Sequence, residues 1–249
     1  MEITMEGYRP YRKMAGTCRT RPRRERRITW NWTESEPLMD GRYQVKPLRQ
    51  GLVESAAELW RSAYPELYGS PHEFLFDPGQ VEKMVALKES WDEDAERKVY
   101  CMPVVEELSS ARVVSATVLT KFERNLQVEY SFAATLPKYR MQDLTDELRK
   151  VTRMIASSSG AEYFTTFCET WHEITQNWCF QEDWKVAGIF PGNYVRWNGG
   201  NQEYRGCTVH FYKFAPEAEE YVTKPEEWRL ASGLEKIWKA LEEVNRRGV

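Results

Sequence analysis

The segment of residues 126–160 constrains the fold of this chain more than any other stretch, and it reads LQVEYSFAATLPKYRMQDLTDELRKVTRMIASSSG. Residues 128–136 are mostly apolar, aromatic or β-branched, which predicts a half-buried strand. The next apolar residues recur at helical spacing and predict a helix: Leu144, Leu148, Val151, Met154 and Ile155. A strand that turns directly into a helix leaves N–H groups unpaired at the helix N-terminus. The segment therefore offers a site for an anion, particularly a phosphate.

Regular elements are also predicted before this segment. Residues 43–48 alternate as a strand does, and residues 53–64 carry a helical stripe of apolar side chains. Asp77 as N-cap, followed by Pro78, starts a second helix that should run to about residue 90. The β-rich runs 98–105 and 112–121 predict an antiparallel hairpin. Residues 65–76 between the two helices, rich in Pro, Gly and aromatics, are typical of a mobile segment over a site.

The second half continues the alternation of strands and helices. We expect a strand at 161–168, a short helix at 171–180 and a strand at 184–190. A polar loop rich in Gly and Asn should follow at 191–206, before a last strand at 207–214.

A family resemblance enters at residues 136–145, which read LPKYRMQDLT. They resemble the acyl-CoA motif of the GNAT superfamily, the Gcn5-related N-acetyltransferases: Pro137-x-Tyr139-Arg140 matches it, whereas Asp143 and Thr145 stand where the family has glycines. The order of elements over 43–214 is also similar to that of the family. The resemblance implies an α/β fold for residues 42–214, with a mixed, mostly antiparallel sheet whose central strands splay apart between flanking helices.

The resemblance also implies a cofactor, acetyl-CoA or another acyl-CoA. Its pantetheine would pair with the strand end Ala133, Ala134 and Thr135. Its pyrophosphate would lie on the turn formed by Arg140, Met141, Gln142, Asp143, Leu144 and Thr145. Asp143 leaves two arrangements open, because as N-cap of the following helix its carboxylate would occupy part of the phosphate site, and otherwise it points away.

The implied activity is direct transfer of an acyl group, expected to be acetyl, to a small amine or amino acid. Transfer needs a base for the ammonium and an acid for the leaving thiolate. Glu129 stands on the strand where many family members carry a catalytic glutamate. The tyrosine that family members often have on the helix after the fifth strand is absent here, so Tyr194 or Cys179 would take its place, and His172 would carry protons.

A second reading stays open beside the enzyme. The departure at Asp143 and the missing tyrosine also fit a catalytically silent GNAT-fold module that works as a binding or assembly subunit. Such a module would use the two ends of the chain, residues 1–41 and 215–249.

Residues 1–41 form a basic arm, with Trp30 and Trp32 near its end; its cations are Arg9, Arg12, Lys13, Arg19, Arg21, Arg23, Arg24, Arg26 and Arg27. Such an arm docks on an acidic partner or on the acidic remainder of its own chain, and we predict that residues 1–41 lie outside the core. In residues 215–249 an amphipathic helix should begin at Pro225 and carry two tryptophans. The arm and this helix would contact their own chain, a second copy of it, or another protein.

Composition excludes several classes of protein. A formal net charge of −3 with 41% hydrophobic residues argues against a nucleic-acid or membrane partner. No apolar run approaches the ~20 residues that span a bilayer, and we expect a cytoplasmic protein. The 5 cysteines lack C-x-x-C spacing and the 3 histidines are dispersed, so no metal site is predicted.

Overall fold

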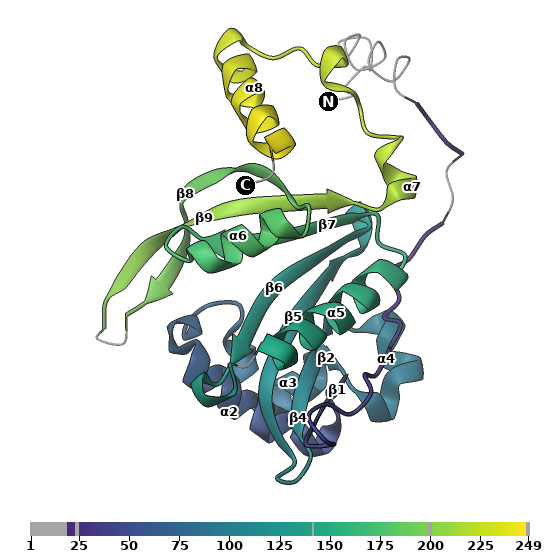
Figure 1. Ribbon diagram of the computed structural model, residues 1–249, viewed down its shortest axis with the longest axis vertical. Helices are drawn as coiled ribbons and strands as arrows, with labels where there is room; N and C mark the ends of the chain where they lie inside the picture. The colour runs from purple at the N-terminus through teal and green to yellow at the C-terminus, as the bar shows by residue number, and fades with distance from the viewer. Residues whose placement is uncertain (1–18, 23–24, 141, 199–200, 248–249) are drawn as a thin grey trace, which may run out of the picture.

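One twisted, nine-stranded sheet carries the fold of the computed structural model, which describes residues 19–22, 25–140, 142–198 and 201–247 (Figure 1). Its main path runs β1-β4-β5-β6-β7-β9-β8, with β2 and β3 beside it. The strands are β1 (Tyr43–Pro47), β2 (Val85–Ala86), β3 (Tyr100–Cys101), β4 (Pro103–Glu107), β5 (Arg112–Phe122), β6 (Gln127–Thr135), β7 (Tyr163–Glu169), β8 (Lys185–Trp197) and β9 (Glu203–Phe214). Only β6–β7 and β2–β3 pair in parallel among the described strands. The sheet is therefore mixed and mostly antiparallel, which confirms the predicted fold class.

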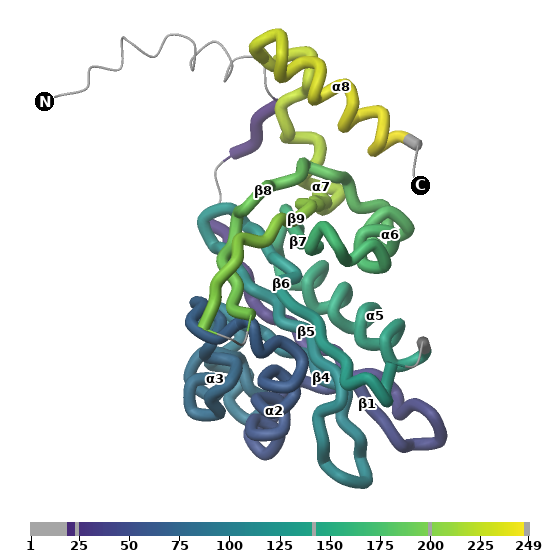
Figure 2. The backbone as a smooth tube through the Cα atoms, turned by 90° about the vertical axis from the view of Figure 1, so that its left-hand side faces the viewer, coloured from purple at the N-terminus to yellow at the C-terminus, as the bar shows by residue number. Residues whose placement is uncertain are grey.

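Helices cover both faces of the sheet. They are α2 (Val53–Ala63), α3 (Pro78–Met84), α4 (Trp91–Arg97), α5 (Gln142–Ser158), α6 (Glu173–Gln181), α7 (Pro216–Glu219) and α8 (Ser232–Arg247). Short 3-10 turns join them: η2 (Gln50–Leu52), η3 (Pro65–Leu67), η4 (Glu73–Phe76), η5 (Lys88–Ser90), η6 (Glu123–Asn125), η7 (Pro137–Tyr139) and η8 (Pro225–Glu227). Figure 2 shows α2 and α3 on one side of the sheet and α5 and α6 on the other. Each side has its own buried apolar cluster. No described helix is both long and apolar enough to cross a membrane.

The predicted start of α3 is confirmed, and its predicted end is wrong. Asp77 Oδ1 accepts from the N–H groups of Gly79 at 2.8 Å and Gln80 at 3.2 Å. The helix stops at Met84, since the chain becomes extended and pairs with β3 as strand β2. By periodicity alone, the apolar run after Met84 fits either a helix or a strand. Pairing with β3 makes it a strand.

The hairpin of β8 and β9 is longer than the sequence predicts. Most of the expected loop at 191–206 is strand, because β8 extends to Trp197 and β9 already starts at Glu203. A register shift between Phe190 and Tyr194 absorbs the backbone of Gly192, whose φ is +61°. Polar residues are frequent along this outer hairpin, and backbone pairing holds the two strands together without an apolar pattern.

The C-terminal helix begins later than predicted. The segment at Pro225 forms only the short turn η8, and α8 starts at Ser232. Trp228 lies between them and packs on Trp238, with ring centroids 4.6 Å apart. Near the other end of α8, Asn245 Oδ1 accepts from the N–H of Val186 at 2.7 Å, and its Nδ2 donates to Val186 O at 3.1 Å. The Asn245 side chain thus satisfies backbone groups on the edge strand β8.

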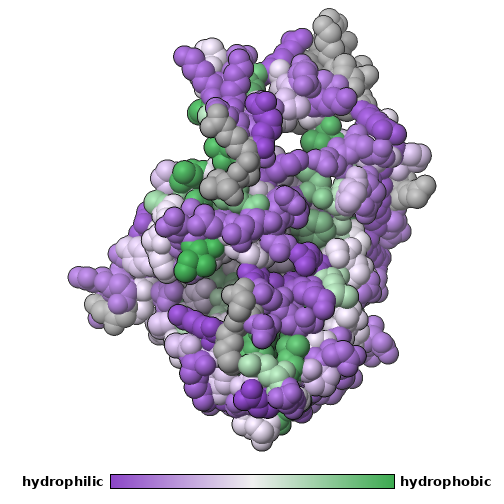
Figure 3. Space-filling model, in the orientation of Figure 1, coloured by the Kyte–Doolittle hydropathy of each residue, from purple (hydrophilic) through white to green (hydrophobic). Residues whose placement is uncertain are grey.

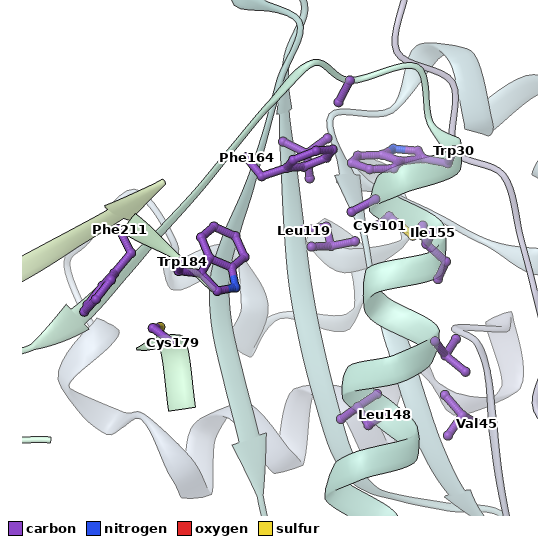
Figure 4. Close-up of a cluster of buried hydrophobic side chains, with 14 of the residues drawn as sticks. Trp30, Val45, Cys101, Leu119, Leu148, Ile155, Phe164, Cys179, Trp184 and Phe211 are labelled. Carbon is purple, nitrogen blue, oxygen red and sulfur yellow. The ribbon is translucent and has the colours of Figure 1, made fainter. Parts of the chain in front are cut away.

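Part of the basic arm belongs to the core, so the prediction that residues 1–41 lie outside it is wrong. Ile28 and Trp30 are 0% exposed and share a cluster with Ile155 and Phe164 (Figure 4). Trp30 Nε1 donates to Lys98 O at 3.1 Å. A short apolar motif inside a basic run carries no period, which is why the sequence pattern misses it.

The described cations of the arm bind the chain's own acidic groups. Arg21 and Arg26 both pair with Glu162, and Arg27 pairs with Glu96 at 2.8 Å. Of the two dockings considered for the arm, the described residues adopt the one on their own chain. Five of its predicted cations lie outside the described residues: Arg9, Arg12, Lys13, Arg23 and Arg24.

Trp30→Ala should lower the free energy of unfolding by about 3–5 kcal/mol, because it leaves a cavity the size of an indole in a packed core. Urea denaturation measures the change. Trp171→Ala is the matched control, since Trp171 is 72% exposed and should change the stability by less than about 0.5 kcal/mol. Equal small effects of the two variants would contradict the placement of the arm in the core.

Candidate functional site

The parallel strands β6 and β7 separate partway along their length. Their pairing ends at Tyr130 and Thr166. Beyond that point β6 continues against β5 to Thr135, and β7 continues against β9 to Glu169. The two strands therefore diverge, and the inner edge of each is left without a neighbouring strand.

A cavity of about 1370 Å³ lies at this divergence. Its walls come from β6, β7, α5, α6, the segment around η3, and the β8–β9 hairpin. Figure 3 shows this face of the molecule hollowed between α5 and α6. Glu129, His172 and Tyr194, which are far apart in the sequence, all line this one cavity.

Glu129 is a half-buried carboxylate in the cavity wall. Burial raises its pKa above the ordinary glutamate value, and the hydrogen bond that Ser131 Oγ donates at 2.9 Å acts in the opposite direction. No described lysine or arginine forms an ion pair with Glu129. A carboxylate with a raised pKa in a cleft has the properties of a general base.

Tyr194 lies on the opposite wall, on β8. Its ring covers Gly206 of β9, and the guanidinium of Arg196 lies 4.1 Å from the ring centroid. Burial and the neighbouring carboxylate of Glu169 raise its pKa. The phenol therefore keeps its proton at neutral pH, and the Glu169 carboxylate accepts a hydrogen bond from it.

The other two candidates for proton transfer, His172 and Cys179, are less accessible from the cavity. His172 Nδ1 accepts from the N–H of Thr175 at 3.3 Å and lies 2.6 Å from Thr175 Oγ1, so His172 caps α6 while it lines the cavity. Cys179 is 0% exposed, its Sγ lies 3.6 Å from Cys168 Sγ, and it does not line the cavity. The contact with Cys168, together with burial, raises the pKa of the Cys179 thiol. Cys179 is thus shielded from any ligand in the cavity.

The predicted pantetheine edge lines the cavity, with its carbonyls engaged by side chains of the same chain. Ala133 O accepts from Tyr64 Oη at 2.9 Å, and Thr135 O accepts from Arg140 Nε at 3.3 Å. Ala134 O accepts from Ser115 Oγ at 2.9 Å. A ligand that pairs with this edge would replace the bonds from Tyr64 and Arg140.

The predicted phosphate turn is only partly in the cavity. Arg140 and Thr145 line it, whereas the side chain of Leu144 is 0% exposed in the core. Met141 lies outside the described residues, and Gln142 is described only as the first residue of α5. Leu144 can therefore contribute only its backbone to a phosphate site.

Of the two arrangements left open for Asp143, the structure has the one in which its side chain points away from the cavity and is not the N-cap of α5. The helix begins one residue earlier, and Asp143 is exposed in its first turn. There the partial positive charge of the helix N-terminus stabilises the carboxylate. Asp143 is not part of the cavity wall, which is the arrangement that leaves the cavity free of its side chain.

Several lining residues are absent from the sequence-based site. Arg149 and Arg153 are one helical turn apart on α5, and both line the cavity with Thr145. The spacing of four residues could have indicated that the three side chains share one face of the helix. Tyr64 and Arg196 come from distant elements. Their partners are set by tertiary packing, and no local pattern marks them.

The chain holds no cluster that resembles a metal centre within the described ranges, where no three His, Cys, Asp or Glu side chains form a metal-binding group. The polar side chains that line the cavity include carboxylates, phenols, imidazoles, guanidinium groups and hydroxyls.

Gly206→Ala should destabilise the protein by about 1–3 kcal/mol, because overpacking forces side chains to shift. A Cβ at this position would overlap the ring of Tyr194. In a Tyr194→Ala background the same change should cost close to nothing, and thermal denaturation of the four proteins in this double-mutant cycle measures the coupling. An equal cost in both backgrounds would show that the ring does not lie on Gly206.

No family model and no curated protein matches the sequence. Solved structures match the fold. A ribosomal-protein-S5-alanine acetyltransferase from Vibrio fischeri has a TM-score of 0.55 at 11% identity, covering 74% of this chain and 96% of that one. A probable acetyltransferase of the GNAT family from Chromobacterium violaceum has a TM-score of 0.52 at 12% identity, covering 79% and 94%. A mutant spermidine/spermine N-acetyltransferase from Vibrio cholerae has a TM-score of 0.51 at 10% identity, covering 72% and 96%. The chain has the fold of the GNAT superfamily.

Proposed function

We propose that this protein is an acyl-CoA-dependent N-acyltransferase that transfers an acyl group, most simply acetyl, directly to a small amine or amino acid. The observation that carries the proposal is Glu129, a half-buried carboxylate without an ion-pair partner among the described residues, placed where β6 and β7 diverge. The fold of acetyltransferases supports it. The acceptor class and the transfer mechanism are part of the proposal.

The chemistry of the donor set fits acetyl-CoA. The open edge of β6 at Ala133 and Thr135 offers backbone groups to an extended amide chain. Three guanidinium groups line the α5 side of the cavity: Arg140, whose Nε donates to Thr135 O, and Arg149 and Arg153, which pair with Asp146 and Glu182. A phosphate would compete with these partners for them. Acetyl-CoA, when bound, supplies an activated thioester.

Two residues in different walls of the cavity would carry out the two proton transfers. Glu129 accepts a proton from the ammonium of the acceptor, which frees the lone pair needed for attack. On β8, Tyr194 Oη would give a leaving thiolate the proton that Glu169 accepts in this structure. Glu129 lies on β6 and Tyr194 lies on β8, so the proposed base and the proposed acid are carried by different strands.

A catalytically silent binding or assembly subunit is the second candidate. Two observations favour it: own-chain donors engage the carbonyls of Ala133 and Thr135, and α8 exposes Leu234 by 54% and Ile237 by 58%. A large exposed apolar side chain often marks a contact surface. The cofactor titration below separates the two candidates.

Isothermal titration should show binding of CoA and acetyl-CoA, and Arg140→Ala should weaken it about tenfold, because it removes a charge-assisted hydrogen-bond donor. Arg246→Ala, an exposed change on α8, is the control and should leave the affinity unchanged. Asp143→Gly should change it less than threefold, a factor below about 0.7 kcal/mol. No binding to the wild type at millimolar concentration would sink the enzyme proposal, and binding gained only in Asp143→Gly would favour the silent subunit.

Glu129→Gln should retain CoA binding and lose turnover by about 100-fold or more, because the amide cannot accept the proton. With the wild type, kcat/KM should fall as the pH drops through the raised pKa of Glu129, since the base works only when it is ionised. A panel of primary amines with a thiol-release assay measures both. Full activity of the variant at neutral pH would exclude Glu129 as the base.

A further inference from the structure

Glu129 is the end of a chain of hydroxyl groups. Ser131 Oγ donates to Glu129 Oε1 at 2.9 Å, and Thr120 Oγ1 lies 2.7 Å from Ser131 Oγ. A hydroxyl carries a single proton, and Ser131 gives its proton to the carboxylate. The proton between the two hydroxyls therefore belongs to Thr120. The chain has one direction while Glu129 is ionised, from Thr120 through Ser131 to Glu129.

A β-bulge lies at this contact. Between β5 and β6, Thr120 faces Glu129 and Leu119 faces Tyr130, but Val118 faces Phe132, so Ser131 is an extra residue. Residues opposite each other in a ladder share a face of the sheet. In a regular strand, Ser131 and Phe132 would point to opposite faces. Here Phe132 shares the face of Thr120 and Glu129, and the hydroxyl of Ser131 reaches the same two residues.

The surroundings of Glu129 leave few other groups to stabilise its charge. Tyr100 on β3 lies opposite Thr120, and burial, followed by the charge of Glu129, raises its pKa. His72, beside η4, packs on Phe132 at 4.7 Å, and burial lowers its pKa. Burial raises the pKa of Tyr64 to about 12. These three groups are uncharged at neutral pH.

We propose that Thr120 and Ser131 are positioning residues that orient the Glu129 carboxylate in the cavity wall and stabilise its negative charge. This inference rests on the proposed role of Glu129 as the base. A base at this site must be ionised before the acceptor amine arrives, although the site is half-buried. The hydroxyl pair supplies fixed dipoles beside the half-buried carboxylate, and it adds no charge that would hold the carboxylate in an ion pair.

Thr120 has a separate part in this arrangement. It is 5% exposed, so its hydroxyl is shielded from bulk water. By donating to Ser131, it satisfies the serine oxygen and leaves the serine proton for Glu129. Hydrogen bonds in such a chain polarise one another, so Thr120 strengthens the bond to the carboxylate without touching it.

Carbon-detected NMR titration of glutamate labelled at Cδ, with the Glu129 signal identified by its loss in Glu129→Gln, measures the pKa of Glu129 in the absence of any substrate. Ser131→Ala should raise this pKa by about one, because the loss of one hydrogen bond to a charged group corresponds to roughly a tenfold change. Thr120→Val should raise it by less. Ser131→Thr keeps the hydroxyl and should restore a value close to that of the wild type.

Tyr100→Phe is the matched control, since its phenol is neutral and should leave the pKa of Glu129 unchanged. Thermal denaturation verifies that each variant is folded. An unchanged pKa in folded Ser131→Ala overturns the inference, and so does an equal rise in Ser131→Ala and Ser131→Thr. If Ser131→Ala does not fold, Thr120→Val is the test instead. An unchanged pKa of Glu129 in Thr120→Val then overturns the inference.

The outcome separates this inference from the proposed function. A pKa that responds to Ser131, in a protein that does not bind CoA, would keep the hydroxyl chain and discard the acyltransferase. Where turnover is measured, the acidic limb of kcat/KM should move to higher pH in Ser131→Ala by the same amount as the NMR pKa. A merely structural role of Ser131 would lower activity at all pH values without moving the limb.

Discussion

The parallel pairing of β6 and β7 is the constraint on which the rest of this structure depends, because it is short. Four residue pairs hold the two strands together, from Gln127–Tyr163 to Tyr130–Thr166. Each strand then keeps its outer neighbour, so neither is free to follow the other. Unpaired backbone inside a protein must meet side chains, water or a ligand. Tyr64 and Arg140 meet two of these carbonyls here, and the cavity provides space for a ligand that would do the same.

The order of elements could be predicted from local patterns, and the fold class from the resemblance of that order and of residues 136–145 to the GNAT superfamily. The apolar spacing on α5 and the cap at Asp77 give the elements without knowledge of their partners. The sequence-based predictions are wrong where the structure of a segment depends on the segment packed beside it. Val85 becomes strand because β3 lies beside it, and Tyr194 is in strand because β9 pairs with it across a polar hairpin. Trp30 is core because α5 and β7 leave room for an indole.

The residues of the candidate site also fall into those that could be predicted from the sequence and those that could not. Glu129 and the edge at Ala133 could be placed from the family resemblance of the strand that carries them, and they line the cavity. Tyr64 could not be placed, because its bond to Ala133 O joins residues 69 apart in the sequence. The sequence left two arrangements open for Asp143, because the first residue of a helix is uncertain by one or two positions, and α5 begins one residue earlier, at Gln142. One residue is enough to change which side chain closes a helix N-terminus.

The bulge at Ser131 and the end of the β6–β7 pairing fall at neighbouring positions on one strand. Pairing with β7 stops at Tyr130, and the extra residue on the β5 side is the next one. A bulge increases the local twist of its strand, which turns β6 away from β7 at the point where the two part. The same residue places a hydroxyl against Glu129. The residue that contacts Glu129 is therefore also the extra residue of the bulge, at the position where the two strands part.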